Sequence, residues 1–178
     1  MENYELGYLI GATVGLLIGL AVAVPLLKFM KKDGKLKCKY DERQEIVRGR
    51  AFKYGFFTYL VYLFLDMIYG DYLERVMERG VVSFAGLILG VVVYAGYAIW
   101  NDGYFSLNEY PVRVVLTFAV LSLTYFAVAG IHIFALKDMV KHGVLSIHAI
   151  TLLCGIMMLI ILLLVLVKCA CKKGLEEG

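Results

Sequence analysis

The chain has little proline and little charge for its length, and both shortages exclude whole classes of protein. Two prolines and 18 glycines without a period exclude collagen-like and proline-rich segments. Charged residues make up 19% of the 178 residues, whereas soluble domains have about 25%. Hydrophobic residues make up 61% of the chain, which excludes an ordinary soluble domain and also a disordered chain.

Catalytic and cofactor signatures are absent as well. The sequence contains no phosphate-binding GxxxxGK[ST] loop, no HExxH zinc motif, no GxSxG nucleophile elbow and no CxxC pair. Since no pattern indicates a bound cofactor, we expect none and favour a role that is not enzymatic.

Long apolar segments are abundant instead. A bilayer core needs about 20 apolar residues in a helix, and five segments meet that length. They cover about residues 7–27, 51–72, 81–100, 112–136 and 145–167. Their residues do not alternate as barrel strands do, so we predict an all-α, polytopic integral membrane helical bundle of about five transmembrane helices in a single domain. Residues 28–50 are predicted to form a basic cytosolic loop with a short helix from about residue 41.

The positive charge is unevenly distributed, and this predicts the orientation. Residues 28–53 contain ten Lys or Arg and four acids, a net charge of +6, whereas the rest of the chain sums to −3. Short loops rich in Lys and Arg stay cytosolic. Five spans then put 14 Lys or Arg inside and four outside. We predict a multi-pass protein of the cytoplasmic membrane with its N-terminus outside and its C-terminus in the cytosol.

Glycines recur at helix spacing in two spans. A four-residue step returns to nearly the same face of a helix, and small residues there let another backbone approach closely. The positions are Gly7, Gly11, Gly15 and Gly19 in the first span, and Gly86 and Gly90 in the third. The pattern predicts helix packing, either inside one bundle or between two copies of the chain through the first span.

Five lysines follow the first span closely. Such runs bind anionic lipid headgroups at about 1 kcal/mol per residue. We therefore predict that this run lies on the headgroups, and we expect no nucleic-acid partner. The lysines are Lys31, Lys32, Lys35, Lys37 and Lys39.

The next residues have the pattern of a helix start. Asp41 is a capping residue, and Gln44 three positions later completes a capping box. The helix would continue through Gly49 into the second span. Its first residues, including Glu42 and Arg43, would then stand at the cytosolic surface, accessible to a protein partner.

The same region carries a resemblance. The run Tyr40-Asp41-Glu42-Arg43-Gln44, followed by Arg48-Gly49-Arg50-Ala51 and Phe57-Thr58, resembles uncharacterised small multi-pass membrane proteins of Gram-positive bacteria. These carry a D-E-R-Q opening before an aromatic span. The resemblance covers about 20 residues and implies a bacterial cytoplasmic membrane protein, but it implies no activity.

The candidates for chemistry lie on the predicted outer side. His132, His142 and His148 fall there, and Asp66 is a carboxylate well inside the second predicted span. An ionisable residue in a span suggests function, and His132, His148 or Lys137 could be the partner of Asp66. Imidazoles and a carboxylate suit a divalent metal or proton-coupled switching. The alternative is that Asp66 pairs for structure and that the histidines are scattered.

Two function classes follow. The first is an interaction or regulatory membrane protein that uses its basic cytosolic loop and the helix start at Asp41. The alternative is a subunit of a small proton-linked or metal-linked channel or transporter that uses Asp66 and the outer histidines.

Overall fold

The computed structural model describes residues 2–33 and 37–176, and it is mostly helical. This confirms the prediction of an all-α chain. The elements are α1 (Glu2–Met30), α2 (Glu42–Leu73), α3 (Arg79–Trp100), α4 (Pro111–Gly130), a π-helical turn (Ile131–Leu136), β1 (Val140–Lys141), β2 (Val144–Leu145) and α5 (Ala149–Glu176).

Two element boundaries differ from the prediction. The fifth helix begins at Ala149 rather than near residue 145, because Val144 and Leu145 pair with β1 in a hairpin. A second boundary differs less, since α2 ends at Leu73 and its start agrees with the prediction: the short helix from about residue 41 continues through Gly49 into the second span, as expected. Both halves of the predicted capping box are present, since the Asp41 side chain accepts from the Gln44 N–H at 2.7 Å and the Gln44 side chain accepts from the Asp41 N–H.

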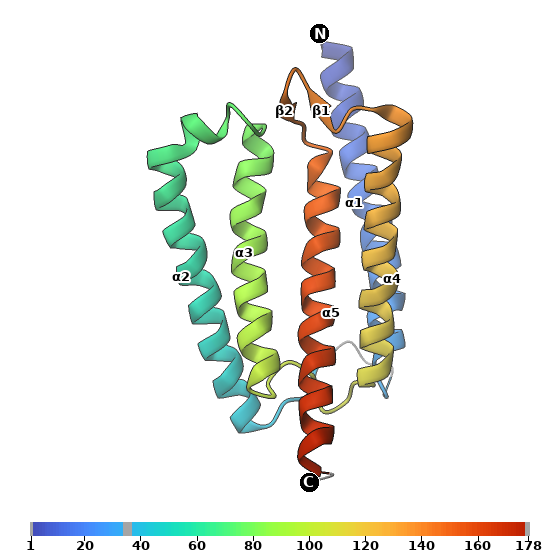
Figure 1. The fold of residues 1–178 in the computed structure, drawn as a ribbon. Coiled ribbons are helices and arrows are strands. Elements are labelled where there is room, and N and C mark those ends of the chain that lie inside the picture. The colour runs from blue at the N-terminus through green and yellow to red at the C-terminus, as the bar shows by residue number, and fades with distance from the viewer. Residues whose placement is uncertain (1, 34–36, 177–178) are drawn as a thin grey trace.

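Helices α2, α3, α5 and α4 stand side by side in a row rather than in a closed ring (Figure 1). α2 packs on α3, α3 on α5, α5 on α4, and α4 on α1. The N-terminus, the hairpin and the α2–α3 turn lie at one end, called here the hairpin end. The described residues of segment 31–41, the loop 101–110 and the C-terminal part of α5 lie at the other, the basic end.

Glycines set the contact between α2 and α3. A Cβ built on Gly55 would lie 2.7 Å from the Gly90 carbonyl oxygen, and one built on Gly90 would lie 3.0 Å from the Gly55 oxygen. A Cβ on Gly86 would collide with the Tyr62 ring. The two backbones therefore approach closely along the face that holds Gly86 and Gly90.

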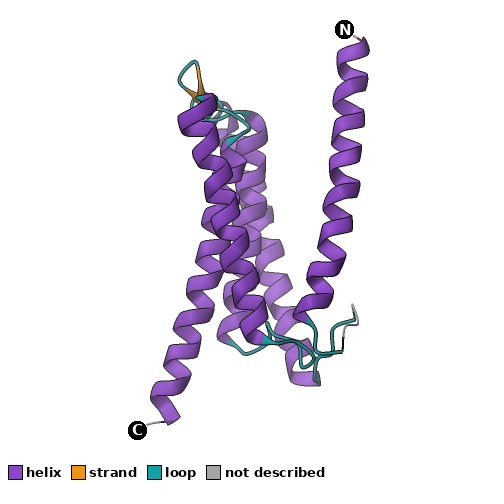
Figure 2. Ribbon diagram, turned by 90° about the vertical axis from the view of Figure 1, so that its right-hand side faces the viewer, coloured by secondary structure: helices purple, strands orange, loops and turns teal. Residues whose placement is uncertain are grey.

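Helix α1 stands apart from the other four and diverges from them toward its N-terminus (Figure 2). It joins them near its last turn, where the Tyr110 N–H donates to the Met30 carbonyl and Arg113 to the Phe29 carbonyl. Among the residues that the structure describes, nothing lies within 4 Å of a Cβ built on the first-span glycines Gly7, Gly11, Gly15 and Gly19. Internal packing of that face is not observed, and the contact between copies stays a prediction.

Candidate functional site

A compact polar cluster lies at the hairpin end, between α4 and α5. His132 Nδ1 donates to Asp138 Oδ1 at 2.8 Å, and His148 Nε2 lies 3.4 Å from Asp138 Oδ2. The two imidazole rings stack with centroids 4.4 Å apart and planes 20° apart. One imidazole from the π-helical turn and one from the turn that precedes α5 therefore converge on a single carboxylate.

The hairpin brings these residues together. Pairing of Val140 with Leu145 leaves the two-residue turn His142–Gly143, whose φ angles of 51° and 81° are both left-handed. Such a turn fits the twist of a tight hairpin, and glycine adopts it without strain. The same pairing continues to Met139, whose carbonyl accepts from the Ser146 N–H, so Asp138 is carried beside the start of α5.

Of the four predicted metal candidates, the structure brings two together. His132 and His148 meet, but His142 is exposed in the hairpin turn and is not part of this cluster. The third member is Asp138, which was not among the candidates predicted from the sequence. The short β-type runs on either side of His142–Gly143 were the available signal, because a two-residue hairpin puts residue 138 opposite residue 147.

Asp138 is held in its charged form by this arrangement. The hydrogen bond from His132 is the largest effect that lowers the pKa of Asp138, and partial burial opposes it. An ionised carboxylate beside two imidazoles is a donor set that divalent metals use.

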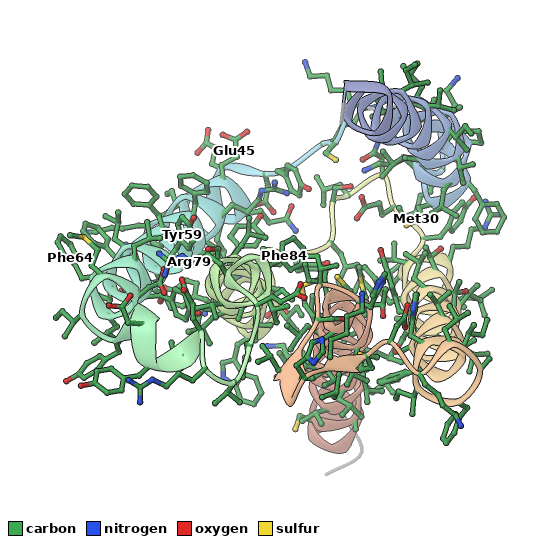
Figure 3. All side chains as sticks on the ribbon, turned by 90° about the horizontal axis from the view of Figure 1, so that it is seen from above. Met30, Glu45, Tyr59, Phe64, Arg79 and Phe84 are labelled. Carbon is green, nitrogen blue, oxygen red and sulfur yellow. The ribbon has the colours of Figure 1, made fainter. Side chains whose placement is uncertain are left out.

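Asp66 belongs to a different contact. Its Oδ2 lies 3.2 Å from Arg79 Nη2, so the expected pairing with a histidine or Lys137 is corrected. Arg79 lies between α2 and α3 (Figure 3). Phe64, which lies on α2 together with Asp66, points outward from the bundle. A Cβ on Gly70 would lie 2.5 Å from Arg79 Nη1, so this glycine leaves the space through which the guanidinium reaches Asp66.

A second polar cluster lies at the basic end, around Lys31. The Lys31 side chain is 2% exposed, and its ammonium forms an ion pair with Glu109. It also donates to Ser106 Oγ at 3.1 Å and to Cys38 Sγ at 2.8 Å. The prediction that Lys31 lies on lipid headgroups is therefore wrong, because its charge is neutralised inside the protein.

Asn108 connects the two loops of this end. Its amide donates to the Asp33 carboxylate at 3.1 Å and to the Lys37 carbonyl at 3.0 Å, and its oxygen accepts from the Lys39 N–H. The side chains of Lys32, Lys37 and Lys39 remain exposed. Lys35, another predicted headgroup contact, lies outside the described residues.

Cys38 has an unusual environment in this cluster. Burial would raise the pKa of the Cys38 thiol, but the hydrogen bonds from Lys31 and Tyr40 lower it overall. Burial likewise opposes the charged form of Lys31, yet the hydrogen bonds to Cys38 and Glu109 raise the pKa of Lys31 overall. The cluster therefore favours the charged forms of both groups.

The start of α2 is fixed against the same end. Gln44 donates from its side-chain amide to the Phe105 carbonyl at 3.1 Å and to the Asp102 carbonyl at 3.3 Å. Asp41, Glu42 and Arg43 stay exposed beside it. The predicted partner surface is thus a rigid helix start that is attached to the loop 101–110.

Comparison with known proteins gives no further guide, since no protein-family model, no curated protein and no solved structure matches the chain.

Proposed function

We propose that the chain is a multi-pass membrane protein that acts by interaction rather than catalysis, with its basic end as the docking surface for a cytosolic protein. Five of the described helices are long and apolar enough to cross a membrane. Large apolar side chains point outward from them, with Met67 81% exposed and Leu123 72% exposed, as suits contact with lipid tails.

The orientation proposed with this function puts the basic end in the cytosol and the N-terminus outside. It is supported by the 14 Lys or Arg that would then lie inside against four outside. It is also supported by the position of the two chain ends, which lie at opposite ends of the bundle (Figure 1). The cytoplasmic membrane of a bacterium stays the proposed location, as the D-E-R-Q resemblance implies.

One observation carries the docking role: the basic segment is tied into a defined shape. The buried pair of Lys31 with Glu109 and the hydrogen bonds of Asn108 fix its described residues on the loop 101–110. The exposed Arg43 and Glu42 then stand on a capped helix. Pre-organised charges lose little entropy on binding a partner, which is what a specific docking surface needs. The exposed lysines around it would hold anionic headgroups.

Charge reversal at Arg43 tests this function without disturbing the cap. A photocrosslinking residue placed at Glu42 should give a discrete adduct with a cytosolic protein in intact membranes, and Arg43→Glu should remove that adduct. The matched control is Lys141→Glu, which reverses an exposed charge at the hairpin end and should leave the adduct unchanged. An adduct that survives Arg43→Glu at full yield contradicts the docking role.

The proton-linked or metal-linked transporter is the second candidate, and a single observation favours it. Asp66 is 6% exposed, and its Oδ1 has no hydrogen-bond partner among the described residues. A buried carboxylate oxygen of that kind marks a candidate proton or cation position. Ion flux into proteoliposomes should fall in Asp66→Asn if Asp66 takes part in transport, and equal flux in the variant rejects that role.

A further inference from the structure

We propose that His132, Asp138 and His148 form a binding site for one first-row divalent transition-metal ion, of which Zn²⁺ is the natural probe. The site lies at the hairpin end, and its existence does not depend on the docking function proposed for the basic end.

The donor atoms are close to the separation that a metal requires. One ring nitrogen from each histidine and one carboxylate oxygen lie within 4.8 Å of one another. Zinc bonds to nitrogen and carboxylate oxygen are about 2.0–2.2 Å, so two donors on one ion lie at most about 4.3 Å apart. Small side-chain rotations therefore suffice to bring all three donors onto one ion.

The donor types agree with this assignment. Both rings already direct a nitrogen at the same carboxylate, with separations of 2.8 Å and 3.4 Å, so the donors converge on one region. Two imidazoles and one carboxylate bind zinc and other first-row ions, whereas Mg²⁺ and Ca²⁺ prefer oxygen donors. Three protein ligands leave a further position for water or an exogenous ligand.

The backbone around the site is held firmly. Ser146 Oγ donates to the Asp138 carbonyl at 2.6 Å, and Thr151 Oγ1 donates to the His148 carbonyl at 2.7 Å. Met139 and Ala149, each next to a ligand, are buried against Val81 and Ala129. Ligands supported in this way lose little freedom when the metal binds, which raises affinity.

The site is also accessible. The side chains of His132, Asp138 and His148 are 17%, 25% and 33% exposed. This exposure gives an ion a route from the solvent at the hairpin end. It also distinguishes the site from the Lys31 cluster, whose cation is already provided by the protein.

The test uses the full chain in detergent, without a polyhistidine tag and after removal of bound metal. Titration with ZnCl₂ in a calorimeter should show one ion per chain. His132→Ala, Asp138→Ala and His148→Ala should each weaken binding by at least about 100-fold. His142→Ala removes an exposed histidine from the same hairpin and should change the affinity less than twofold. A wild-type protein that binds no zinc, or an equal loss in His142→Ala, overturns the proposal.

A second measurement needs no variant and so does not depend on how the variants fold. Diethyl pyrocarbonate modifies accessible histidine nitrogens, and mass spectrometry locates each modified residue. Saturating Zn²⁺ should protect His132 and His148 from modification while His142 continues to react. Modification of all three at the same rate with and without Zn²⁺ overturns the proposal.

Discussion

The polar clusters at the two ends of the bundle differ in how their charges are matched. At the basic end, the buried ammonium of Lys31 meets Glu109, Ser106 and Cys38, so the protein supplies both the cation and its partners. At the hairpin end, a partly exposed carboxylate faces two imidazole rings. The first arrangement fastens two loops together, whereas the second has the donors to receive a cation from outside.

Removal of Lys31 should have the largest effect on stability, because Lys31 is the buried cation of the cluster at the basic end. Lys31→Met leaves the Glu109 side chain, 13% exposed, as a buried charge without its partner. Loss of one member of a buried ion pair costs about 3–5 kcal/mol in the free energy of unfolding. Unfolding of the wild type and the variant in mixed micelles measures this loss. The control Lys32→Met, at an exposed neighbour, should cost less than about 0.5 kcal/mol.

A double variant separates the energy of the ion pair from the cost of leaving one of its charges buried alone. Lys31→Met with Glu109→Leu removes both charges, so its cost should be well below the sum of the two single variants. Additive losses would show that Lys31 and Glu109 do not act as a pair.

Bound Zn²⁺ should have the next largest effect on stability, and it should act at the hairpin end. A ligand that binds the folded state at 100 times its dissociation constant stabilises it by about 2.7 kcal/mol. Zn²⁺ should therefore raise the melting temperature of the wild type and of Lys32→Met, but not that of Asp138→Ala. An equal rise in Asp138→Ala would place the bound zinc elsewhere.

The ion pair of Arg79 with Asp66 gives the next test, because it lies near the hairpin end but outside the proposed metal site. Arg79→Ala removes the charge partner of buried Asp66. Since the Arg79 side chain is 55% exposed and water can replace part of the contact, the expected loss is about 1–2 kcal/mol. Arg75→Ala, in the neighbouring turn, is the control and should cost less. Zinc affinity should be the same in both variants, and a selective loss in Arg79→Ala would link Asp66 to the metal site.

The smallest effect concerns the pH dependence of Cys38. With the other cysteines replaced, alkylation of Cys38 should reach half its maximal rate below pH 9.0, the ordinary thiol value, because its pKa is lowered. Lys31→Met should move that midpoint upward. Because the pKa of Cys38 is lowered in the folded protein, its thiolate stabilises the fold above the ordinary thiol pKa. This contribution is lost as pH falls through the lowered pKa. A midpoint unchanged by Lys31→Met contradicts the assigned contact.

The local pattern of the sequence was enough to predict the helices. Their length and composition, and the capping box at Asp41 and Gln44, depend on neighbours in the chain, and the structure contains both. The burial of Lys31 was not predictable in this way. Its partners Ser106 and Glu109 lie more than 70 residues away, and the spacing of lysines says nothing about which one turns inward.

The candidate site, too, could be predicted from the sequence only in part. His132 and His148 were selected as candidate ligands by residue type, but the choice of carboxylate required the position of Asp138 beside the start of α5. Asp66 was favoured because it lies inside a span, yet its partner is Arg79, the first residue of the next helix, α3. Residue type therefore identified candidate chemistry, while long-range packing decided which candidates met.

The difference between the two ends is tested most directly by hydrogen–deuterium exchange with and without Zn²⁺. We predict that zinc slows amide exchange in the π-helical turn and the hairpin, residues 131–148, and leaves exchange in the segment 38–44 and the loop 101–110 unchanged. Equal slowing at both ends, or none at the hairpin end, would contradict the account.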